Sequence, residues 1–289
     1  MAGPLTPDQI AAFRRDGYLV LPDALTPTQV AALNADFEDW VGESREHGDG
    51  FGKTMDGRPR FDVEPGHSAE APALRRVSSP VEISDTYLAV MRDNRALDAV
   101  AQIFGPNIQF NNAKVNSKLP GATTEVKYHQ DFLFEPHSND DLMTVLFFLD
   151  DVTMENGPLE VVPGTHTGPL YEHWHGGVFT GAVTDKIEAE MRPRAAHCTG
   201  PAGAACLMHT RLIHGSTANL SHGPRTLYIV TYCAEDAQPL ITNHIPSAYE
   251  GEIVRGERTN RIRSVPYEMA TPEYPKEASF FGQQAKASH

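Results

Sequence analysis

The sequence predicts a mainly β protein with flanking helices, and three observations carry this expectation. Signals for helix starts are concentrated in the first third of the chain, many short apolar strands follow, and a Pro-rich polar tail comes last. Helices followed by a run of strands are typical of a double-sheet jelly roll with helices packed outside it. We therefore expect a single domain over 1–289, with N-terminal helices at about 5–105, a jelly-roll core at about 108–235 and a C-terminal tail at about 240–289.

Two similar signals mark the first helices. Thr6 and Thr26 are each followed by Pro and, three residues on, by Gln, which is the pattern of a capping box with Pro at the first helical position. A short strand is expected between them at 18–21, and a third helix over 84–104. The stretch 42–72 is rich in Gly, Pro and charge without periodicity, so we expect a long loop of a kind that is usually functional or mobile.

The strand region shows a period of two. Asn112, Lys114, Asn116 and Lys118 fall on one face of a predicted strand at 111–118, and small or apolar residues fall on the other. Such a strand can lie between a polar pocket and a core, although a solvated edge protected by lysines would give the same pattern. Further strands are expected at 126–131, 143–149, 159–162, 204–210 and 226–233.

Composition argues against several classes of partner. The formal net charge of −14 disfavours nucleic acid or an anionic membrane surface. No apolar run is long enough for a transmembrane helix, and the first residues lack the features of a signal peptide. The three cysteines, an odd number with no close pair, are expected to be reduced and buried in a cytoplasmic protein rather than zinc ligands.

The residues that carry chemistry are His129-Gln130-Asp131 and the distant His214. Two histidines and one carboxylate form the facial triad of non-heme Fe(II) oxygenases, which leaves coordination positions open. Side chains at i and i+2 of an extended segment point to the same side, so His129 and Asp131 can reach one ion from one strand. Arg225, further on, can hold a carboxylate through its planar guanidinium. Because the chain has 13 histidines, a satisfied polar His–Asp pair is the alternative.

The order of motifs around these residues resembles the phytanoyl-CoA dioxygenase family of Fe(II)/2-oxoglutarate-dependent oxygenases. The resemblance covers about 19–232 and rests on His129-Gln130-Asp131, on the run from Asn156-Gly157-Pro158 to Pro163-Gly164-Thr165-His166, and on His214-Gly215-Ser216 followed by Arg225. It implies a double-stranded β-helix (jelly-roll, cupin-like) core. It also implies Fe(II) on His129, Asp131 and His214, with 2-oxoglutarate as cosubstrate and O₂ in the remaining positions.

The same resemblance implies further site residues. Arg225 and Ser216 match positions that contact 2-oxoglutarate, and alignment brings Lys114 and Arg76 onto contact positions as well. His166 is expected to be a hydrogen-bonded turn residue. The segment 171–177, with its histidines, glycines and aromatic residues, is expected to be a mobile loop near substrate rather than a zinc site. The 42–72 loop and the tail after 241 are candidates to close over the iron.

We therefore expect a dioxygenase that hydroxylates an unactivated C–H bond of a small organic substrate and releases succinate and CO₂, with desaturation or ring formation left open. Asp131 argues against an iron halogenase, in which a small residue replaces the carboxylate. A cupin-like isomerase or epimerase would need no dicarboxylate anchor such as Arg225 and Ser216. A non-catalytic binding module would need no intact triad. A small molecule is the expected partner, without nucleic acid or membrane, and the sequence leaves the oligomeric state open.

Overall fold

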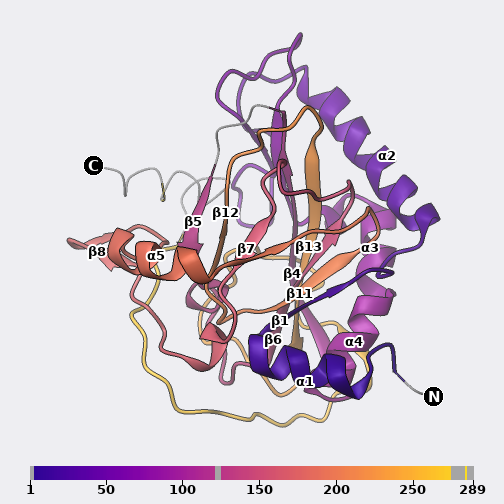
Figure 1. Ribbon diagram of the computed structural model, residues 1–289. Coiled ribbons are helices and arrows are strands. Elements are labelled where there is room, and N and C mark those ends of the chain that lie inside the picture. Colours follow the sequence, from indigo (N-terminus) through magenta and orange to yellow (C-terminus); the bar gives the residue numbers. More distant parts are fainter. Residues whose placement is uncertain (1–2, 121–124, 275–283, 285–289) are drawn as a thin grey trace.

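The computed structural model describes residues 3–120, 125–274 and 284 of the chain, and within them helices flank extended β-sheets (Figure 1). The α-helices are α1 (Pro7–Asp16), α2 (Pro27–Ser44), α3 (Asp85–Arg92), α4 (Arg95–Phe104) and α5 (Asp185–Met191). Single turns of 3₁₀ helix are η1 (Pro80–Glu82), η2 (Asp131–Leu133), η3 (Thr165–Thr167) and η4 (Arg192–Arg194).

Strand pairing is antiparallel throughout. The large sheet has the order β1 (Tyr18–Leu21), β11 (Ala205–His209), β6 (Leu142–Phe148), β13 (Arg225–Ala234), β4 (Ile108–Lys118), β3 (Leu74–Ser78), β2 (Phe61–Val63), and β14 (Ile253–Arg255) also pairs with β4. The smaller sheet has the order β10 (Ala196–Cys198), β7 (Leu159–Val161), β12 (His214–Ser216), β5 (Val126–His129). A hairpin joins β8 (Trp174–His175) to β9 (Val178–Phe179). The expectation of a mainly β chain with flanking helices is confirmed.

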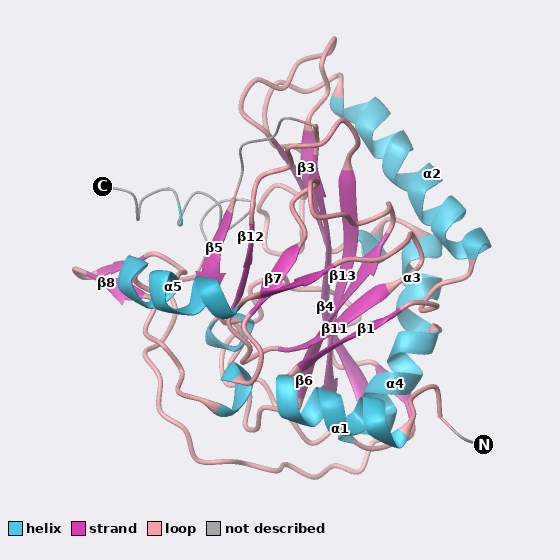
Figure 2. Ribbon diagram, viewed as in Figure 1, coloured by secondary structure: helices cyan, strands magenta, loops and turns pink. Residues whose placement is uncertain are grey.

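The period-two pattern decides which face of the large sheet packs on the helices and which faces the smaller sheet. Helices α2, α3 and α4 lie together along one side of this sheet (Figure 2), where residues such as Val115, Tyr228 and Val230 bury against them. The alternate residues of the same strands, such as Leu227 and Ile229, belong to a second cluster that β7 and β10 of the smaller sheet complete. The polar face of β4 therefore points toward the space between the two sheets.

The predicted helix starts are confirmed, but the third predicted helix is wrong as a single element. Both Thr6 and Thr26 form complete capping boxes. The predicted helix 84–104 is two helices, because Asn94 has an extended backbone and its side chain accepts a hydrogen bond from the Leu97 amide. Asparagine competes well as an N-cap in this way, so the chain restarts a helix there.

The 42–72 stretch is more ordered than predicted. Helix α2 runs to Ser44, and β2 pairs with β3. Phe51 stacks on Phe61 with ring centroids 4.4 Å apart. The tail after 241 is mostly without regular structure, as expected, although β14 joins the large sheet. Most of 282–286, also predicted as tail, lies outside the described residues. Closure of these segments over the site stays a prediction.

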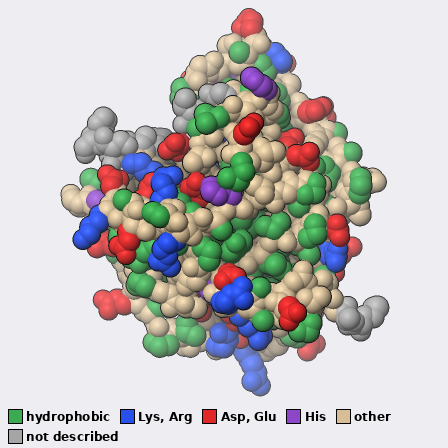
Figure 3. All heavy atoms as spheres, in the orientation of Figure 1, with side chains coloured by type: hydrophobic (Ala, Val, Ile, Leu, Met, Phe, Trp, Pro, Cys, Tyr) green, Lys and Arg blue, Asp and Glu red, His purple; other side chains and the backbone are tan. Residues whose placement is uncertain are grey.

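Charges on the surface are mixed. In Figure 3 acidic and basic side chains lie side by side on the face shown, without a gathered basic patch. No helix in the described part of the chain combines the length and the apolar character needed to cross a lipid bilayer. All three cysteines are free and buried, including Cys198 and Cys206, whose sulfur atoms lie 3.4 Å apart.

Candidate active site

Strand β5 and turn η2 place His129 and Asp131 together. The predicted strand 126–131 ends earlier, at His129, and Asp131 is the first residue of the 3₁₀ turn. Gln130 between them is still extended (φ −123°, ψ 123°), so the two flanking side chains point to the same side as expected. The Gln130 side chain points the other way, where it donates to the carbonyls of Pro169 and Arg211 at 3.2 and 2.7 Å. These bonds fix the turn.

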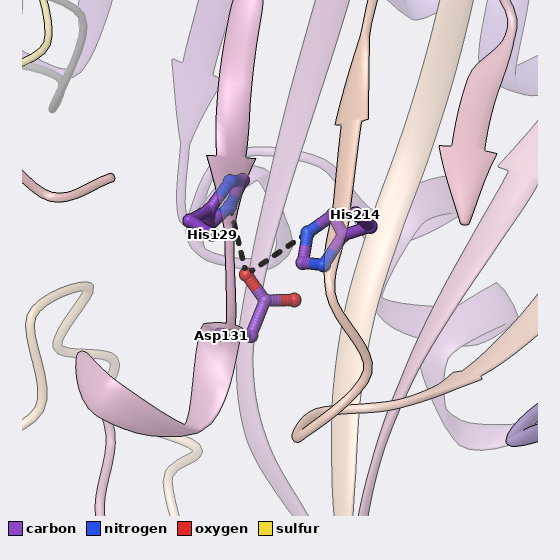
Figure 4. A group of neighbouring side chains, drawn as sticks. All are labelled: His129, Asp131 and His214. Atoms are coloured by element: carbon purple, nitrogen blue, oxygen red, sulfur yellow. Dashed lines mark ion pairs between the residues drawn. The ribbon is translucent and has the colours of Figure 1, made fainter. Parts of the chain in front are cut away.

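His214 comes from β12, which pairs with β5 so that His214 lies directly opposite His129. The three side chains converge in Figure 4, and their ligand atoms lie within 4.8 Å of one another. Asp131 Oδ1 is 3.4 Å from His129 Nε2 and 3.5 Å from His214 Nε2. Within the described residues this is the one cluster of at least three His, Cys, Asp or Glu side chains with such a separation.

Hydrogen bonds orient each potential ligand. Nδ1 of His129 bonds the Lys127 carbonyl and Nδ1 of His214 bonds the Leu212 carbonyl, both at 2.9 Å. This tautomer leaves each Nε2 lone pair facing the cluster, as in metal sites whose histidines donate their other ring N–H to a carbonyl. Thr144 Oγ1 donates to Asp131 Oδ2 at 2.8 Å, which leaves Oδ1 for an ion.

The electrostatics suit a divalent cation. Burial and the neighbouring His214 lower the pKa of His129, so its imidazole is neutral and able to act as a ligand. Burial alone would raise the pKa of Asp131, but His214, His129 and Lys114 bring it well below its usual value. A deprotonated carboxylate, together with imidazole nitrogens that present free lone pairs, is what a facial Fe(II) site requires.

One end of the adjoining cavity is lined by two cationic side chains. Arg225, the first residue of β13, lies beside Lys118 of β4 in the sheet register, and both line the cavity with Ser216 and the triad. Arg225 is 4% exposed, and its Nε is buried without a hydrogen-bond partner within the described chain. A buried donor without an acceptor is costly, so this Nε is available to a ligand that brings an acceptor.

Lys118 lies at the same end of the cavity and was not among the candidate site residues taken from the sequence. Its ammonium donates to Ser216 Oγ at 2.8 Å and to the Thr217 carbonyl. Burial and the neighbouring Arg225 lower the pKa of Lys118 to about 6, while burial lowers the pKa of Arg225 to about 10. An entering carboxylate would relieve both shifts. The signal that could have found Lys118 is its place on the polar face of β4.

The structure separates the remaining two candidates. Lys114 lines the same cavity as the triad and lies four residues before Lys118 on β4. Arg76 is buried on β3, opposite Asn116 in the sheet, and its Nε lies 3.4 Å from Ser78 Oγ. Arg76 is not among the residues that line this cavity within the described chain. The cosubstrate contacts that the resemblance implies for Lys114 and Arg76 stay predictions.

Two further histidines lie close to the triad without having been assigned a role. Phe134 packs on His129 with ring centroids 5.8 Å apart, and it also contacts His173 and His244 at 5.6 and 6.0 Å. His166, by contrast, is a turn residue of η3 whose Nε2 lies 3.2 Å from the Arg14 carbonyl, in agreement with its predicted structural role.

Comparison with known proteins agrees with this geometry. The family model for phytanoyl-CoA dioxygenase (PhyH) matches residues 13–227, which is more than half of the chain. A probable alpha-ketoglutarate-dependent hypophosphite dioxygenase of Stutzerimonas stutzeri is 34% identical over 212 residues, covering 70% of this chain and 71% of the relative. An L-proline trans-4-hydroxylase of Streptomyces griseoviridis is 29% identical over 245 residues, covering 78% and 85%.

A solved structure shows the same fold. The apo form of EctD from S. alaskensis aligns with a TM-score of 0.67 and 23% identity, over 89% of each chain. The chain therefore belongs to the phytanoyl-CoA dioxygenase family and is a 2-oxoglutarate-dependent dioxygenase that uses iron.

Proposed function

We propose that His129, Asp131 and His214 bind one Fe(II), and that Arg225, Ser216 and Lys118 hold the far carboxylate of 2-oxoglutarate in the adjoining cavity. The observation that carries this proposal is the buried, unpaired Nε of Arg225 in the cavity that the triad also lines. A carboxylate there would accept charge-assisted hydrogen bonds from the guanidinium fork and from the lysine.

When bound, iron and 2-oxoglutarate supply oxidation by O₂, with succinate and CO₂ as the products of the cosubstrate. The protein contributes orientation. Thr144 fixes the Asp131 carboxylate, the two backbone carbonyls fix the imidazoles, and apolar Leu146 and Ile229 line the cavity. We propose hydroxylation of a C–H bond of a small organic molecule as the reaction on the second substrate, since the proline hydroxylase among the relatives carries this activity in its name.

We also infer the finer architecture and setting. The two sheets that face each other across a shared apolar cluster support a double-stranded β-helix, and the pairing of β14 with β4 supports one domain that includes the tail. Buried free thiols support a reducing compartment, hence the cytoplasm. The net charge of −14 supports a small-molecule partner over nucleic acid or an anionic membrane.

The test is iron content and cosubstrate turnover of ligand variants. His129→Ala and His214→Ala should each lose stoichiometric Fe(II) and the conversion of 2-oxoglutarate to succinate, while keeping the melting temperature of the metal-free protein. Asp131→Gly should likewise lose hydroxylation. His197→Ala, which removes a partly exposed histidine of the same sheet, is the control. Full iron occupancy in either histidine variant would overturn the assignment.

A further inference from the structure

The cavity beside the triad has a second cationic end. Lys114 and Lys118 lie on the same face of β4, four residues apart, which corresponds to about 13 Å along the strand. Both line the cavity. Their electrostatic neighbours differ: Lys118 interacts with Arg225, whereas Lys114 interacts with Asp131, Arg76 and Glu135. The two lysines therefore belong to different parts of the cavity.

One molecule of 2-oxoglutarate does not span both ends. Its carboxylate carbons are joined by four C–C bonds of about 1.5 Å, so they are at most about 6 Å apart. With one carboxylate on Arg225 and the other end at the triad, the cosubstrate occupies the part of the cavity near Lys118. On this placement Lys114 is left for the second substrate, in place of the cosubstrate contact that the family resemblance implies for it. Its side chain interacts with the charged groups of Asp131, Arg76 and Glu135.

The charges that face Lys114 leave it incompletely balanced. Asp131 is committed to the metal in the proposed site. Glu135 accepts hydrogen bonds from the side-chain amides of Asn111 at 2.7 Å and Asn112 at 2.5 Å. Burial and the neighbouring Asp131 raise the pKa of Glu135, so this carboxyl group resists ionisation. Lys114 is partly buried and lines the cavity, so an anion that enters there would supply the missing counter-charge.

Two histidines packed on Phe134 have unused hydrogen-bonding groups. His173 is 2% exposed, and neither of its ring nitrogens has a partner within the described residues. Nδ1 of His244 is likewise buried and unpaired. The two rings contact Phe134, which packs on His129. His244 has Lys114 as a charged neighbour, whereas the charged neighbours of His173 are His129, His175, His214 and Asp131. Buried polar atoms are nearly always satisfied in proteins, so these nitrogens point to a ligand.

We propose that the prime substrate carries a small oxyanion, a carboxylate or a phosphonate, that binds Lys114 and His244 on the side of the triad away from Arg225. The inference rests on the proposed function, because it takes the Arg225 end as the cosubstrate site. Lys114 provides the charge, and the His244 imidazole provides a directed hydrogen bond. The anion would thus fix one end of the substrate while the rest of the molecule faces the metal.

The test compares two lysines that share one strand face. Fe(II) enzyme saturated with 2-oxoglutarate is titrated without O₂, by calorimetry, with propionate, propylphosphonate and the uncharged propionamide. Wild-type protein should bind at least one of the two anions at least tenfold more tightly than the amide. Lys114→Met should weaken that anion about tenfold or more and change the Kd of 2-oxoglutarate less than threefold. Lys118→Met should show the opposite pattern.

A histidine pair of variants guards against loss of folding in the lysine variants. His244→Phe should weaken the anion several-fold, and His244→Gln, which restores a hydrogen-bonding group, should recover part of the loss. Preference for propionate assigns a carboxylate, and preference for propylphosphonate assigns a phosphonate. No preference for either anion over the amide would overturn the proposal, as would a Lys114→Met variant that loses 2-oxoglutarate and retains the anion. Failure of the proposed function is distinct, since wild-type protein would then bind neither iron nor 2-oxoglutarate.

Discussion

Removing the Arg225 guanidinium should selectively weaken the binding of 2-oxoglutarate. Arg225 is 4% exposed, and its Nε is buried without a hydrogen-bond partner among the described residues. Its principal charged neighbour is Asp150, which raises the Arg225 pKa that burial lowers. The guanidinium is therefore held in place by the fold but is free to donate to a ligand.

The expected magnitude follows from the number of donors. A planar guanidinium can donate two parallel hydrogen bonds to one carboxylate. A hydrogen bond to a charged group contributes about 1.5–3 kcal/mol, and about 1.4 kcal/mol corresponds to a factor of ten in Kd. Because Lys118 and Ser216 remain, we expect Arg225→Ala to lose about one such bond, or about 10- to 150-fold in Kd. Arg225→Lys should recover only part of this, since it keeps the charge and loses the fork.

The assay is anaerobic calorimetry of the Fe(II) enzyme with 2-oxoglutarate, together with the apparent KM for 2-oxoglutarate in succinate formation. Arg15→Ala is the matched control, because Arg15 lies in an exposed ion pair on α1. Melting temperatures report whether the variants fold. A Kd for Arg225→Ala within twofold of wild type, in a folded protein with full iron, would refute the placement of the cosubstrate.

Three further predictions follow from the same contacts. The pKa of Lys118 is lowered to about 6, and an incoming carboxylate should raise it. Binding of 2-oxoglutarate at pH 7.5 should therefore be accompanied by proton uptake, which calorimetry in buffers of different ionisation enthalpy measures. Lys118→Met should abolish this proton uptake. Thr144→Val removes the 2.8 Å hydrogen bond to Asp131 and should weaken Fe(II) binding by about 10- to 100-fold in a metal competition assay; unchanged affinity would dismiss this orienting role. Burial lowers the pKa of His137 to about 4. Between about pH 6.5 and 4, His137 is therefore protonated in the unfolded chain but neutral in the native chain. The free energy of unfolding of the metal-free protein should fall as the pH is lowered through this range, with about 3 kcal/mol of the decrease due to His137. His137→Gln should remove this contribution to the pH dependence, as measured by urea titrations at several pH values.

Local sequence determined much of the chain's architecture and chemistry. Both capping boxes, at Thr6 and Thr26, depend on residues three apart, so the helix starts could be read directly. The alternation along β4 could be read in the same way, because side-chain direction in a strand has a period of two. The common direction of the His129 and Asp131 side chains also followed from their spacing, although the strand ends two residues earlier than expected.

Helix 84–104 was mispredicted because propensity over the whole stretch outweighed one capping residue. Asn94 stops α3 and starts α4 through a side chain that also donates to Tyr232 Oη, a residue far along the chain. The order of strands between 42 and 78 was missed for a related reason. Short strands such as β2 have little periodicity of their own, and their pairing with neighbours stabilises them.

Only the tertiary structure decided which distant residues share the site. Strand pairing brings His214 opposite His129 and Lys118 beside Arg225, and the packing of the two sheets decides that these side chains face a common cavity. The unpaired nitrogens of His173 were equally invisible in the sequence. Sequence spacing fixes the direction of a side chain within its own helix or strand. The residues that this side chain contacts are fixed by hydrogen bonding and burial between elements, because those contacts join residues separated by long stretches of chain.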